Sequence, residues 1–519
     1  MRAGTGLWQA LEAARRSNLR EAGEAPPTAG SPGTTRRALL KGLVAAGLVP
    51  ALPRPAHAFR GGRVAIVGGG MAGLSALHHL REAGVDAHLY EARGRSGGRM
   101  FTHRPAQGTP FEAGGQLVNT DHADMHALAG RFGIELIDRK AEPHRTLILA
   151  GSHVVAEDSL AEALRPIAAQ IARDADRIDR SPRIAAELDR LSIRGYLQRH
   201  AALMPDAWVL DLLEATSRTE YGVEPDKASA ITLIWNLPTV DGQRIEVLGE
   251  SDERFAIRGG SSALVEAMAE AQRGRISTGK RLLGIRSARE DLTLSFLDGS
   301  TTEAETVILA VPAPITRQID FAVPLPSAWR AYIAAMELGR NEKVQARATE
   351  AVWKAPMGTG GELWQSAADA GYALGWDGSV HLTDTVDPVW TWFLGGNEVD
   401  ADDSPEALAQ HFAASAESAL PGIGAATRTG PFRRTAWHRD PLTLGAYSTF
   451  APGQLTRFGH LMWLEDEGHG ATQVAGTGSI LFAGEHLSDA WPGYMNGAAQ
   501  TGRLAAEAVT GKRALRHAA

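Results

Sequence analysis

The stretch from Val64 to Glu91 constrains this chain more than any other part of its sequence. Val64–Val67 is an uninterrupted apolar run, which is typical of a strand buried on both faces of a parallel sheet. Gly68, Gly70 and Gly73 follow it at the spacing G-x-G-x-x-G. The first glycine permits a tight turn, the second lets the backbone approach a pyrophosphate, and the third lets the next helix pack closely. We therefore expect a strand, a turn and a helix arranged around a phosphate.

The residues after the glycines complete a strand–helix–strand unit. Leu74, Leu77 and Leu80 recur on one face of the expected helix, and Gly84 suits its C-terminal end. The N-terminus of such a helix directs unpaired N–H groups and a partial positive charge toward a phosphate. Glu91 follows a second apolar run at the ~20-residue offset where a carboxylate accepts hydrogen bonds from ribose hydroxyls. Because strand, helix and acid occur in the right order, we interpret this unit as a dinucleotide site rather than an ordinary glycine-rich turn.

A second glycine-rich segment follows directly and reads Glu91-Ala92-Arg93-Gly94-Arg95-Ser96-Gly97-Gly98-Arg99-Met100-Phe101-Thr102. With it the chain resembles the flavin-containing amine oxidases, the monoamine and polyamine oxidase family, whose hallmark here is E-A-R-x-R-x-G-G-R-x-x-T. Further segments are similar to motifs of that family: F-E-A-G-G-Q (111–116), R-G-G (258–260), I-L-F-A-G-E-H (480–486) and G-Y-M-N-G-A (493–498). The resemblance extends from about residue 62 to residue 509 and is specific for the family, not for a substrate.

The resemblance implies an α/β fold with a discontinuous Rossmann-like FAD-binding domain and an inserted substrate domain of mixed helix and sheet. We expect the FAD-binding domain at residues 59–137, 250–330 and 435–519, and the substrate domain at 138–249 and 331–434. Apolar runs at 306–311 and 480–483 are predicted strands of the first domain, and 262–271 and 493–509 are predicted helices. The region 138–250 reads as helical, with Ile167, Ile171 and Ile178 forming a buried stripe.

The first 58 residues differ in kind from the rest. Arg36-Arg37 precede the apolar run 43–52, and Ala56-His57-Ala58 offers a small-x-small cleavage site. The run is too short, and too broken by glycine and proline, to span a membrane. We predict a twin-arginine signal peptide at 1–58, recognised by the twin-arginine export machinery, and a periplasmic or secreted bacterial protein. The alternative is a disordered tail that happens to hold an arginine pair.

Charge and composition exclude several functions. The first 58 residues carry eight Lys or Arg and three Asp or Glu, so a chain of net charge −7 leaves a mature part of −12. This balance argues against a nucleic-acid partner and would concentrate cationic ligands. The absence of cysteine excludes disulfides, thiolate catalysis and zinc–thiolate sites. The short basic tail 511–519 lacks an apolar run, so we expect no stable membrane anchor.

Oxidation of an amine needs an uncharged nitrogen, a carbon held against the flavin and the exclusion of water. Two facing aromatic rings can hold an amine in this way. The resemblance places that pair at Tyr447 and Tyr494, although either tyrosine alone would read as a half-buried core ring. It places at Lys343 the lysine that reaches flavin N5 through water, where burial lowers its pKa and lets it pass protons or assist oxygen. The alternative for Lys343 is a surface residue paired with Glu342.

The resemblance also assigns the contacts with FAD and indicates how FAD is attached. Ala446 stands where some members carry a flavin-linking cysteine, so we expect noncovalent FAD. No arginine occurs in the segment 114–118 to bind a substrate carboxylate, which disfavours α-amino acids. Asn496 replaces a glutamate usual in the family. The predicted cofactor-binding residues are Gly68, Gly70, Met71, Ala72, Gly73, Glu91, Ala92, Arg93, Gly98, Arg99, Gly115, Gln116, Leu283, Trp437, Gly484, Glu485, Tyr494 and Met495.

No metal site is predicted. His438 and His486 are expected to be structural or to lie behind the reacting groups, and Glu465–Glu467 with His469 reads as a solvated loop rather than a set of ligands. The sequence thus predicts an FAD-dependent amine oxidase that converts a primary or secondary amine to an imine by hydride transfer to flavin N5. Oxygen, giving hydrogen peroxide, or a periplasmic acceptor would reoxidise the flavin. Two alternatives remain: a carotenoid- or porphyrin-type desaturase or oxidase of the same fold, and a flavin-binding protein without turnover.

Overall fold

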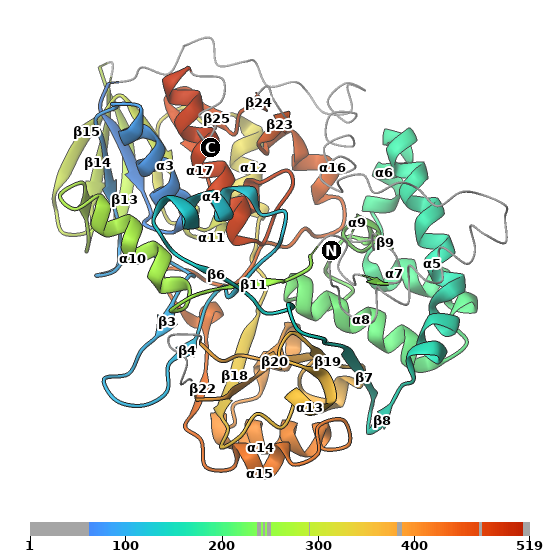
Figure 1. Ribbon diagram of the computed structural model, residues 1–519. Helices are drawn as coiled ribbons and strands as arrows, with labels where there is room; N and C mark the ends of the chain where they lie inside the picture. The colour runs from blue at the N-terminus through green and yellow to red at the C-terminus, as the bar shows by residue number, and fades with distance from the viewer. Residues whose placement is uncertain are drawn as a thin grey trace.

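The computed structural model of the chain describes residues 62–235, 240–241, 244–245, 251–289, 291–380, 387–466 and 470–511. The predicted signal peptide and the basic end after Gly511 lie outside these residues. Figure 1 shows a parallel sheet with helices against it, a second sheet at the opposite end, and a group of helices beside the second sheet. This arrangement has the predicted α/β fold class.

The first sheet, here called the cofactor sheet, is built from segments far apart in the sequence. Its strand order is β12-β2-β1-β16-β26-β25, and β1 pairs in parallel with both β2 and β16. Every residue of β1, β16 and β26 is buried, which explains why each of them is a continuous apolar run. The predicted strands are therefore confirmed, while the domain boundaries stay a prediction. The strands span β12 (Ile276–Ser277), β2 (Ala87–Tyr90), β1 (Val64–Val67), β16 (Thr306–Leu309), β26 (Ile480–Phe482) and β25 (Gly476–Thr477).

Two helices pack against each other at the cofactor sheet, α3 (Met71–Glu82) and α17 (Met495–Thr510). They approach so closely that a Cβ at Gly502 would lie 2.2 Å from the carbonyl oxygen of Ala72. α10 (Ser261–Ala271) and α17 are the predicted helices, and α4 (Ala123–Arg131) contacts α17. The contact between α3 and α17 joins the first and last parts of the described chain.

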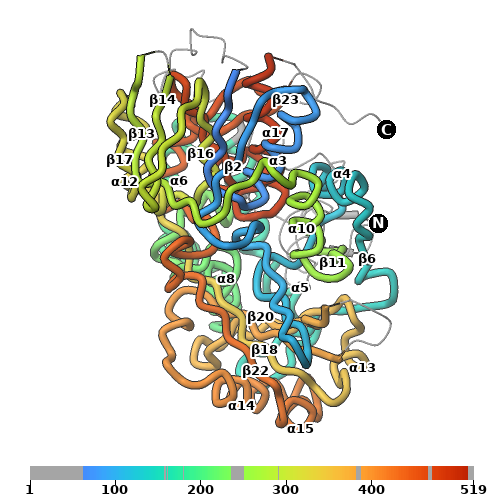
Figure 2. The backbone as a smooth tube through the Cα atoms, turned by 90° about the vertical axis from the view of Figure 1, so that its left-hand side faces the viewer, coloured from blue at the N-terminus to red at the C-terminus, as the bar shows by residue number. Residues whose placement is uncertain are grey.

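The second sheet, here called the substrate sheet, has the order β22-β18-β21-β20-β19-β7-β8. Figures 1 and 2 both show α14 (Pro405–Ala416) and α15 (Ile423–Thr427) on its side away from the cofactor sheet. Trp353, Trp390 and Trp392 are fully buried in the core there, so these three tryptophans act as packing residues. The strands span β22 (Phe432–Arg434), β18 (Glu342–Arg347), β21 (Val389–Leu394), β20 (Leu374–Asp377), β19 (Glu362–Gln365), β7 (Thr146–Ala150) and β8 (His153–Val154).

A group of helices flanks the substrate sheet (Figure 1). Ile167, Ile171 and Ile178 of α5 are all buried, which confirms the predicted stripe. No helix among the residues that the structure describes is long and apolar enough to cross a membrane. The helices of this group are α5 (Glu157–Arg180), α6 (Pro182–Asp189), α7 (Ile193–Arg199), α8 (Ala207–Tyr221) and α9 (Ala230–Trp235).

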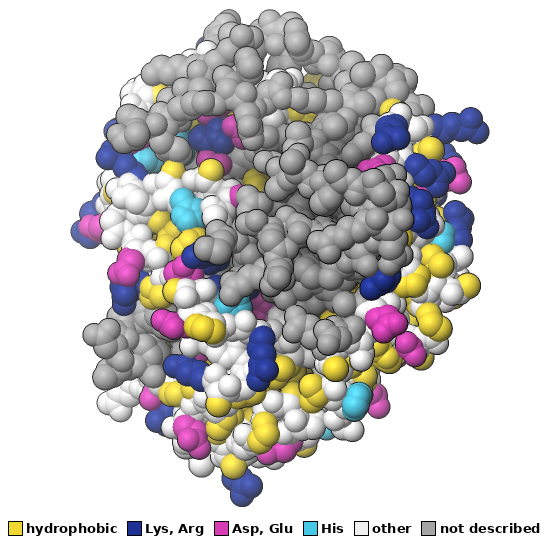
Figure 3. Space-filling model, turned by 45° about the vertical axis from the view of Figure 1, so that its right-hand side comes forward, with side chains coloured by type: hydrophobic (Ala, Val, Ile, Leu, Met, Phe, Trp, Pro, Cys, Tyr) yellow, Lys and Arg dark blue, Asp and Glu magenta, His cyan; other side chains and the backbone are white. Residues whose placement is uncertain are grey.

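Two smaller sheets border the cofactor sheet, with the orders β5-β11-β6 and β15-β14-β13-β17. Figure 3 shows one face of the molecule, on which acidic and basic side chains are interspersed wherever the surface is described. Mixed charge of this kind does not generate the single-sign field that draws a protein to nucleic acid. The strands span β5 (Leu117–Val118), β11 (Phe255–Ile257), β6 (Leu136–Asp138), β15 (Thr301–Ala304), β14 (Asp291–Phe296), β13 (Leu282–Ala288) and β17 (Asp320–Ala322).

Candidate active site

A cavity of about 390 Å³ extends from the glycine turn after β1 to the substrate sheet. Both sheets, the end of α8 and the segment before α17 contribute to its walls. Predicted site residues that line it are Gly68, Gly70, Met71, Ala72, Glu91, Ala92, Arg93, Gly98, Arg99, Gly115, Gln116, Lys343, Trp437, Tyr447, Gly484, Glu485, Tyr494 and Met495. The fold thus gathers residues from five motif segments around one space.

The glycine turn leaves donors and room for a phosphate. Gly70 is the N-cap of α3, and no side chain caps the helix, so its first N–H groups are left for a ligand. A Cβ at Gly70 would meet nothing within 4 Å, whereas one at Gly73 would lie 1.9 Å from the carbonyl oxygen of Gly68. Gly70 therefore faces open cavity, and Gly73 serves the packing of α3 on β1 rather than contact with the ligand.

The Glu91 carboxylate joins the two glycine loops. Its Oε2 accepts a hydrogen bond from the Gly69 N–H at 2.6 Å, and its Oε1 accepts one from the Arg93 N–H at 2.7 Å. The Arg93 guanidinium in turn donates to Asp440 Oδ1 and Thr443 Oγ1, both at 2.8 Å. Glu91 is only 6% exposed, yet it lines the cavity where ribose hydroxyls would bind. The carboxylate thus fixes the loops and remains available to a nucleotide.

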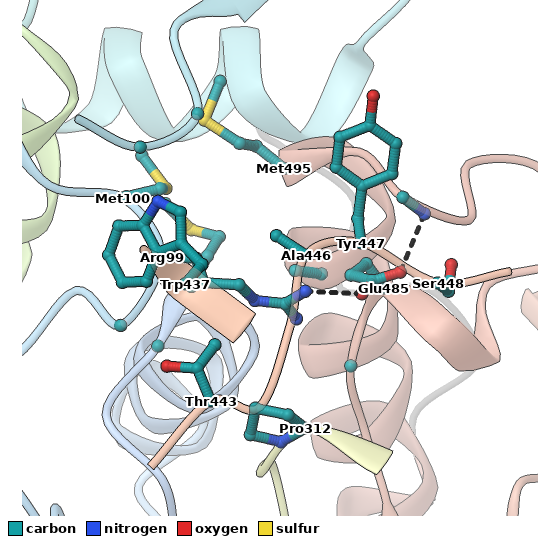
Figure 4. Close-up of a pocket in the computed structure, with 18 of the residues that line it drawn as sticks. Arg99, Met100, Pro312, Trp437, Thr443, Ala446, Tyr447, Ser448, Glu485 and Met495 are labelled. Carbon is teal, nitrogen blue, oxygen red and sulfur yellow. Dashed lines mark hydrogen bonds and ion pairs between the residues drawn. The ribbon is translucent and has the colours of Figure 1, made fainter. Parts of the chain in front are cut away.

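An ion pair and a flat aromatic ring line the next part of the cavity. Arg99 Nη1 lies 3.0 Å from Glu485 Oε1, and Glu485 Oε2 accepts a hydrogen bond from the Gly493 N–H at 2.8 Å (Figure 4). Trp437 is anchored by a 2.8 Å hydrogen bond from its Nε1 to the carbonyl oxygen of Ala113. Figure 4 shows Trp437 on one side of this ion pair and Tyr447 on the other. Phosphate donors, a ribose acceptor and aromatic walls in one cavity fit FAD.

The structure corrects the prediction at Leu283. This side chain is 42% exposed, whereas Leu282 is 7% exposed and lines the cavity. Successive side chains of β13 point to opposite faces, so a shift of one residue exchanges the buried and exposed positions. Leu282 is therefore the side chain that can contact the cofactor.

Lys343 lies inside the cavity and not on the surface. Its Nζ donates hydrogen bonds to the carbonyl oxygens of Glu112 (3.1 Å) and Gly114 (2.8 Å) and to Gln116 Oε1 (3.3 Å). Burial lowers the pKa of Lys343 to about 8. The alternative pairing with Glu342 is wrong, because Glu342 faces the other side of β18 and binds Arg434 at 2.9 Å.

Trp376 was not predicted as a site residue, and it supports Lys343. Its Nε1 donates to Gln116 Oε1 at 3.2 Å, and its ring centroid lies 5.5 Å from Lys343 Nζ. Nothing in the amino-acid pattern distinguishes this tryptophan from those that only pack in the core, because β20 reaches the cavity only through the order of the substrate sheet.

Tyr447 and Tyr494 line the same cavity, and each hydroxyl is tethered. The Tyr447 hydroxyl donates to the carbonyl oxygen of Thr219, and the Tyr494 oxygen accepts a hydrogen bond from Ser251. The Tyr494 ring also meets the His122 ring edge-on at 5.3 Å between centroids. Burial raises the pKa of both tyrosines well above 10, so both hydroxyls stay neutral. These tethers fix the orientation of two neutral rings.

Two acids that belong to no sequence motif complete the cavity wall. They are Glu220 at the end of α8 and Glu253 just before β11. Burial raises the pKa of Glu253 to about 8 and raises that of Glu220 well above its usual range. Their neighbours in the sequence are ordinary helix and loop residues. Sequence reasoning therefore missed both acids.

The remaining polar candidates have mainly structural surroundings. His438 Nδ1 lies 2.6 Å from Glu342 Oε1, while His486 is buried and lines the cavity beside Glu485. Asn496 Oδ1 accepts a hydrogen bond from the Met125 N–H at 3.1 Å and so joins α17 to α4. Glu467 and His469 lie outside the described residues. Among the residues that are described, no group of three or more His, Asp or Glu is arranged to hold a metal.

Comparisons with known proteins agree with this geometry. The family model described as "Flavin containing amine oxidoreductase" matches residues 71–510. Pseudooxynicotine dehydrogenase of a Pseudomonas species is 24% identical over 459 residues, which cover 84% of each chain.

Solved structures show the same fold. Putrescine oxidase bound to putrescine superposes with a TM-score of 0.69 at 22% identity, over 87% of this chain and 99% of that one. Cyclohexylamine oxidase from Brevibacterium oxydans superposes with a TM-score of 0.70 at 23% identity, over 86% of this chain and 98% of that one. With its family motifs gathered around one cavity, the chain belongs to the flavin-containing amine oxidoreductases, which are FAD-dependent enzymes acting on amines.

Proposed function

We propose that the protein oxidises a primary or secondary amine to an imine, which water then hydrolyses to an aldehyde or a ketone. Bound FAD would supply the two-electron acceptor for the hydride that leaves the carbon beside nitrogen. The observation that carries this proposal is that Tyr447 and Tyr494 both line the cavity onto which the glycine turn opens. The proposal is also consistent with the amines named for putrescine oxidase and cyclohexylamine oxidase.

The proposal gives a defined role to the two tyrosines and to Lys343. The rings of Tyr447 and Tyr494 hold the amine by its positive edge and keep water from the reacting carbon. Their tethers to Thr219 and Ser251 keep the rings in place, so little freedom is lost when the amine binds. The Lys343 ammonium group lies beside the carbonyl of Gly114. In that position it can bind a water molecule or assist the reaction with oxygen as a proton donor.

The arginines of the cavity support an amine without a carboxylate. Arg93 is bound to Asp440 and Arg99 to Glu485, while Arg281 donates to Gln318 Oε1 at 2.8 Å. A guanidinium that is already paired offers less to a substrate carboxylate. We therefore propose simple amines rather than α-amino acids as substrates.

The proposed function is tested by adding a panel of amines to the purified holoenzyme without oxygen. An amine substrate should bleach the yellow flavin absorbance, and its imine should appear as an aldehyde or ketone in the same solution. A holoenzyme that no amine bleaches would contradict the proposal and favour a flavin-binding protein without turnover.

Replacing either ring should slow reduction of the flavin. A cation–π contact is worth about 0.5–2 kcal/mol, so Tyr447→Leu and Tyr494→Leu should each lower the reduction rate roughly 2- to 30-fold. The rate is measured by stopped-flow absorbance without oxygen. Tyr372→Leu is the matched control, because Tyr372 is buried in the core of the substrate sheet and does not line the cavity. If both variants are reduced at the parent rate, the assignment of Tyr447 and Tyr494 as the pair of rings that holds the amine is wrong.

FAD should be released completely by denaturation. Ala446 precedes Tyr447 where a thioether would otherwise form, and the chain has no cysteine. Acid or heat should therefore precipitate a colourless polypeptide and leave all flavin in the supernatant. Flavin fluorescence that stays with the washed precipitate would show a covalent link through another residue.

A further inference from the structure

Tyr447 and Tyr494 are here called the cage, and the end of the cavity that lies past them is acidic. Glu220 and Glu253 come from different elements and both line it. Each acid lies next to a tether of the cage, since Tyr447 donates to Thr219 and Tyr494 accepts from Ser251. Figure 4 shows the Tyr447 hydroxyl pointing away from the Arg99–Glu485 pair. The tips of the cage therefore point toward the two acids.

These acids differ from the other carboxylates of the cavity. Glu91 accepts hydrogen bonds from two backbone N–H groups, and Glu485 binds Arg99. The hydrogen bond that the structure gives to the Glu220 carboxyl comes instead from the neutral hydroxyl of Thr219. A carboxylate with so few charged partners retains its affinity for a proton.

The groups around the two acids are short of one positive charge. Glu253 shares a hydrogen bond with Glu362 and faces Arg139 and Lys140, and Lys140 Nζ lies 3.6 Å from Glu362 Oε1. Ionising all three carboxyls, Glu220 included, would set three negative charges against these two cations, so a bound proton or cation beside them is favoured. Tyr447 and Tyr494, which face both acids, are neutral, and Lys343 faces Glu112 as well as Glu253. An ammonium ion, or its proton, would supply the missing charge.

Amine oxidation creates a need for such a proton acceptor. An alkylamine arrives as an ammonium ion with a pKa near 10, but its nitrogen must carry a lone pair before hydride can leave. The other candidates on the wall are poor acceptors. Lys343 Nζ already donates three hydrogen bonds, and burial lowers the pKa of His486 to about 4.

We propose that Glu220, positioned by Thr219 and supported by Glu253, takes the proton of the substrate ammonium. An N–H bond breaks and its electron pair stays on nitrogen, while the proton forms an O–H bond with the Glu220 carboxylate. This step involves no oxidation or reduction, and the neutral amine remains in the cage. Glu220 accepts the proton in its ionised form, and burial raises its pKa and so brings its affinity for a proton closer to that of the amine. This inference rests on the proposed function and names the residue that prepares its substrate.

The test is the pH profile of flavin reduction in the holoenzyme, measured without oxygen at saturating amine. Glu220→Gln should lower the rate by about 100-fold or more at pH 7, the usual range for loss of a general base. The rate should recover as pH rises past the pKa of the amine, because the substrate then arrives neutral. Glu220→Asp, which keeps a carboxylate, should show a smaller loss. Asp211→Asn, an exposed change on the same helix, should behave like the parent.

The outcomes separate this inference from the proposed function. An equal loss at every pH would mean that Glu220 only shapes the cavity and would overturn the inference. An unchanged rate in Glu220→Gln at pH 7 would overturn it as well. If Glu220→Gln does not fold, the profile of Glu220→Asp decides in the same way, since a loss confined to low pH is still required. A parent enzyme that no amine reduces would overturn the proposed function itself.

Discussion

Gly70→Val is expected to give a folded protein that retains no FAD. The space beside Gly70 is open, with nothing within 4 Å of an added Cβ, so the valine strains no neighbour in the chain. That space is where the backbone must approach the pyrophosphate, and a branched side chain would occupy it. We expect affinity for FAD to fall by at least roughly 100-fold, which corresponds to about 3 kcal/mol. The ratio of flavin to protein absorbance after gel filtration measures the loss.

Two further glycines serve as controls for this prediction. Gly130→Val places the same side chain on the exposed side of α4, where an added Cβ also meets nothing, so FAD should be retained. Gly73→Val should instead prevent folding, because its Cβ would lie 1.9 Å from the Gly68 carbonyl oxygen. Circular dichroism should thus report a folded Gly70→Val and an unfolded Gly73→Val. Full retention of FAD by Gly70→Val would show that the pyrophosphate does not pass this residue.

The sequence predicts the cofactor half of the molecule well because its requirements are local. A strand buried on both faces must be a continuous apolar run, and β1, β16 and β26 are such runs. The position of Gly73 against the Gly68 carbonyl allows no side chain, so the glycine pattern appears directly in the sequence. Residues whose identity is dictated by backbone geometry can therefore be recognised from the order of amino acids alone.

The substrate half was harder to predict because its site residues meet only through tertiary packing. Glu220 ends a helix, Glu253 precedes a short strand and Trp376 lies in the middle of the substrate sheet. None of them belongs to a sequence motif, and the sequence alone does not distinguish a buried glutamate from an exposed one. Leu282 and Leu283 show a second limit of prediction from sequence. A shift of one residue in β13 decides which of the two side chains is buried and which is exposed.

Lys343→Met is expected to slow reoxidation of the reduced flavin by oxygen while leaving its reduction by amine within a few-fold of the parent. Lys343 Nζ is held by the carbonyls of Glu112 and Gly114 and by Gln116, so its charge has a fixed place in the cavity. A positioned cation stabilises the negative charge that develops on oxygen as it accepts electrons. Methionine keeps the volume of the side chain and removes that charge. We expect a loss of about 100-fold, the lower range for a group that passes protons.

The pH dependence of reoxidation gives the same prediction a second measurement. Burial lowers the pKa of Lys343 to about 8, so the cation predominates below pH 8 and disappears as pH rises through that value. The parent rate should therefore fall between about pH 7 and pH 9, and Lys343→Met should lose this step. Stopped-flow mixing of reduced enzyme with oxygen, in the absence of amine, isolates the reaction. Lys354→Met, an exposed change on α13 (Lys354–Met357), should keep both the rate and the step. If Lys343→Met reoxidises like the parent, Lys343 does not serve oxygen, and a different electron acceptor becomes the better assignment for this enzyme.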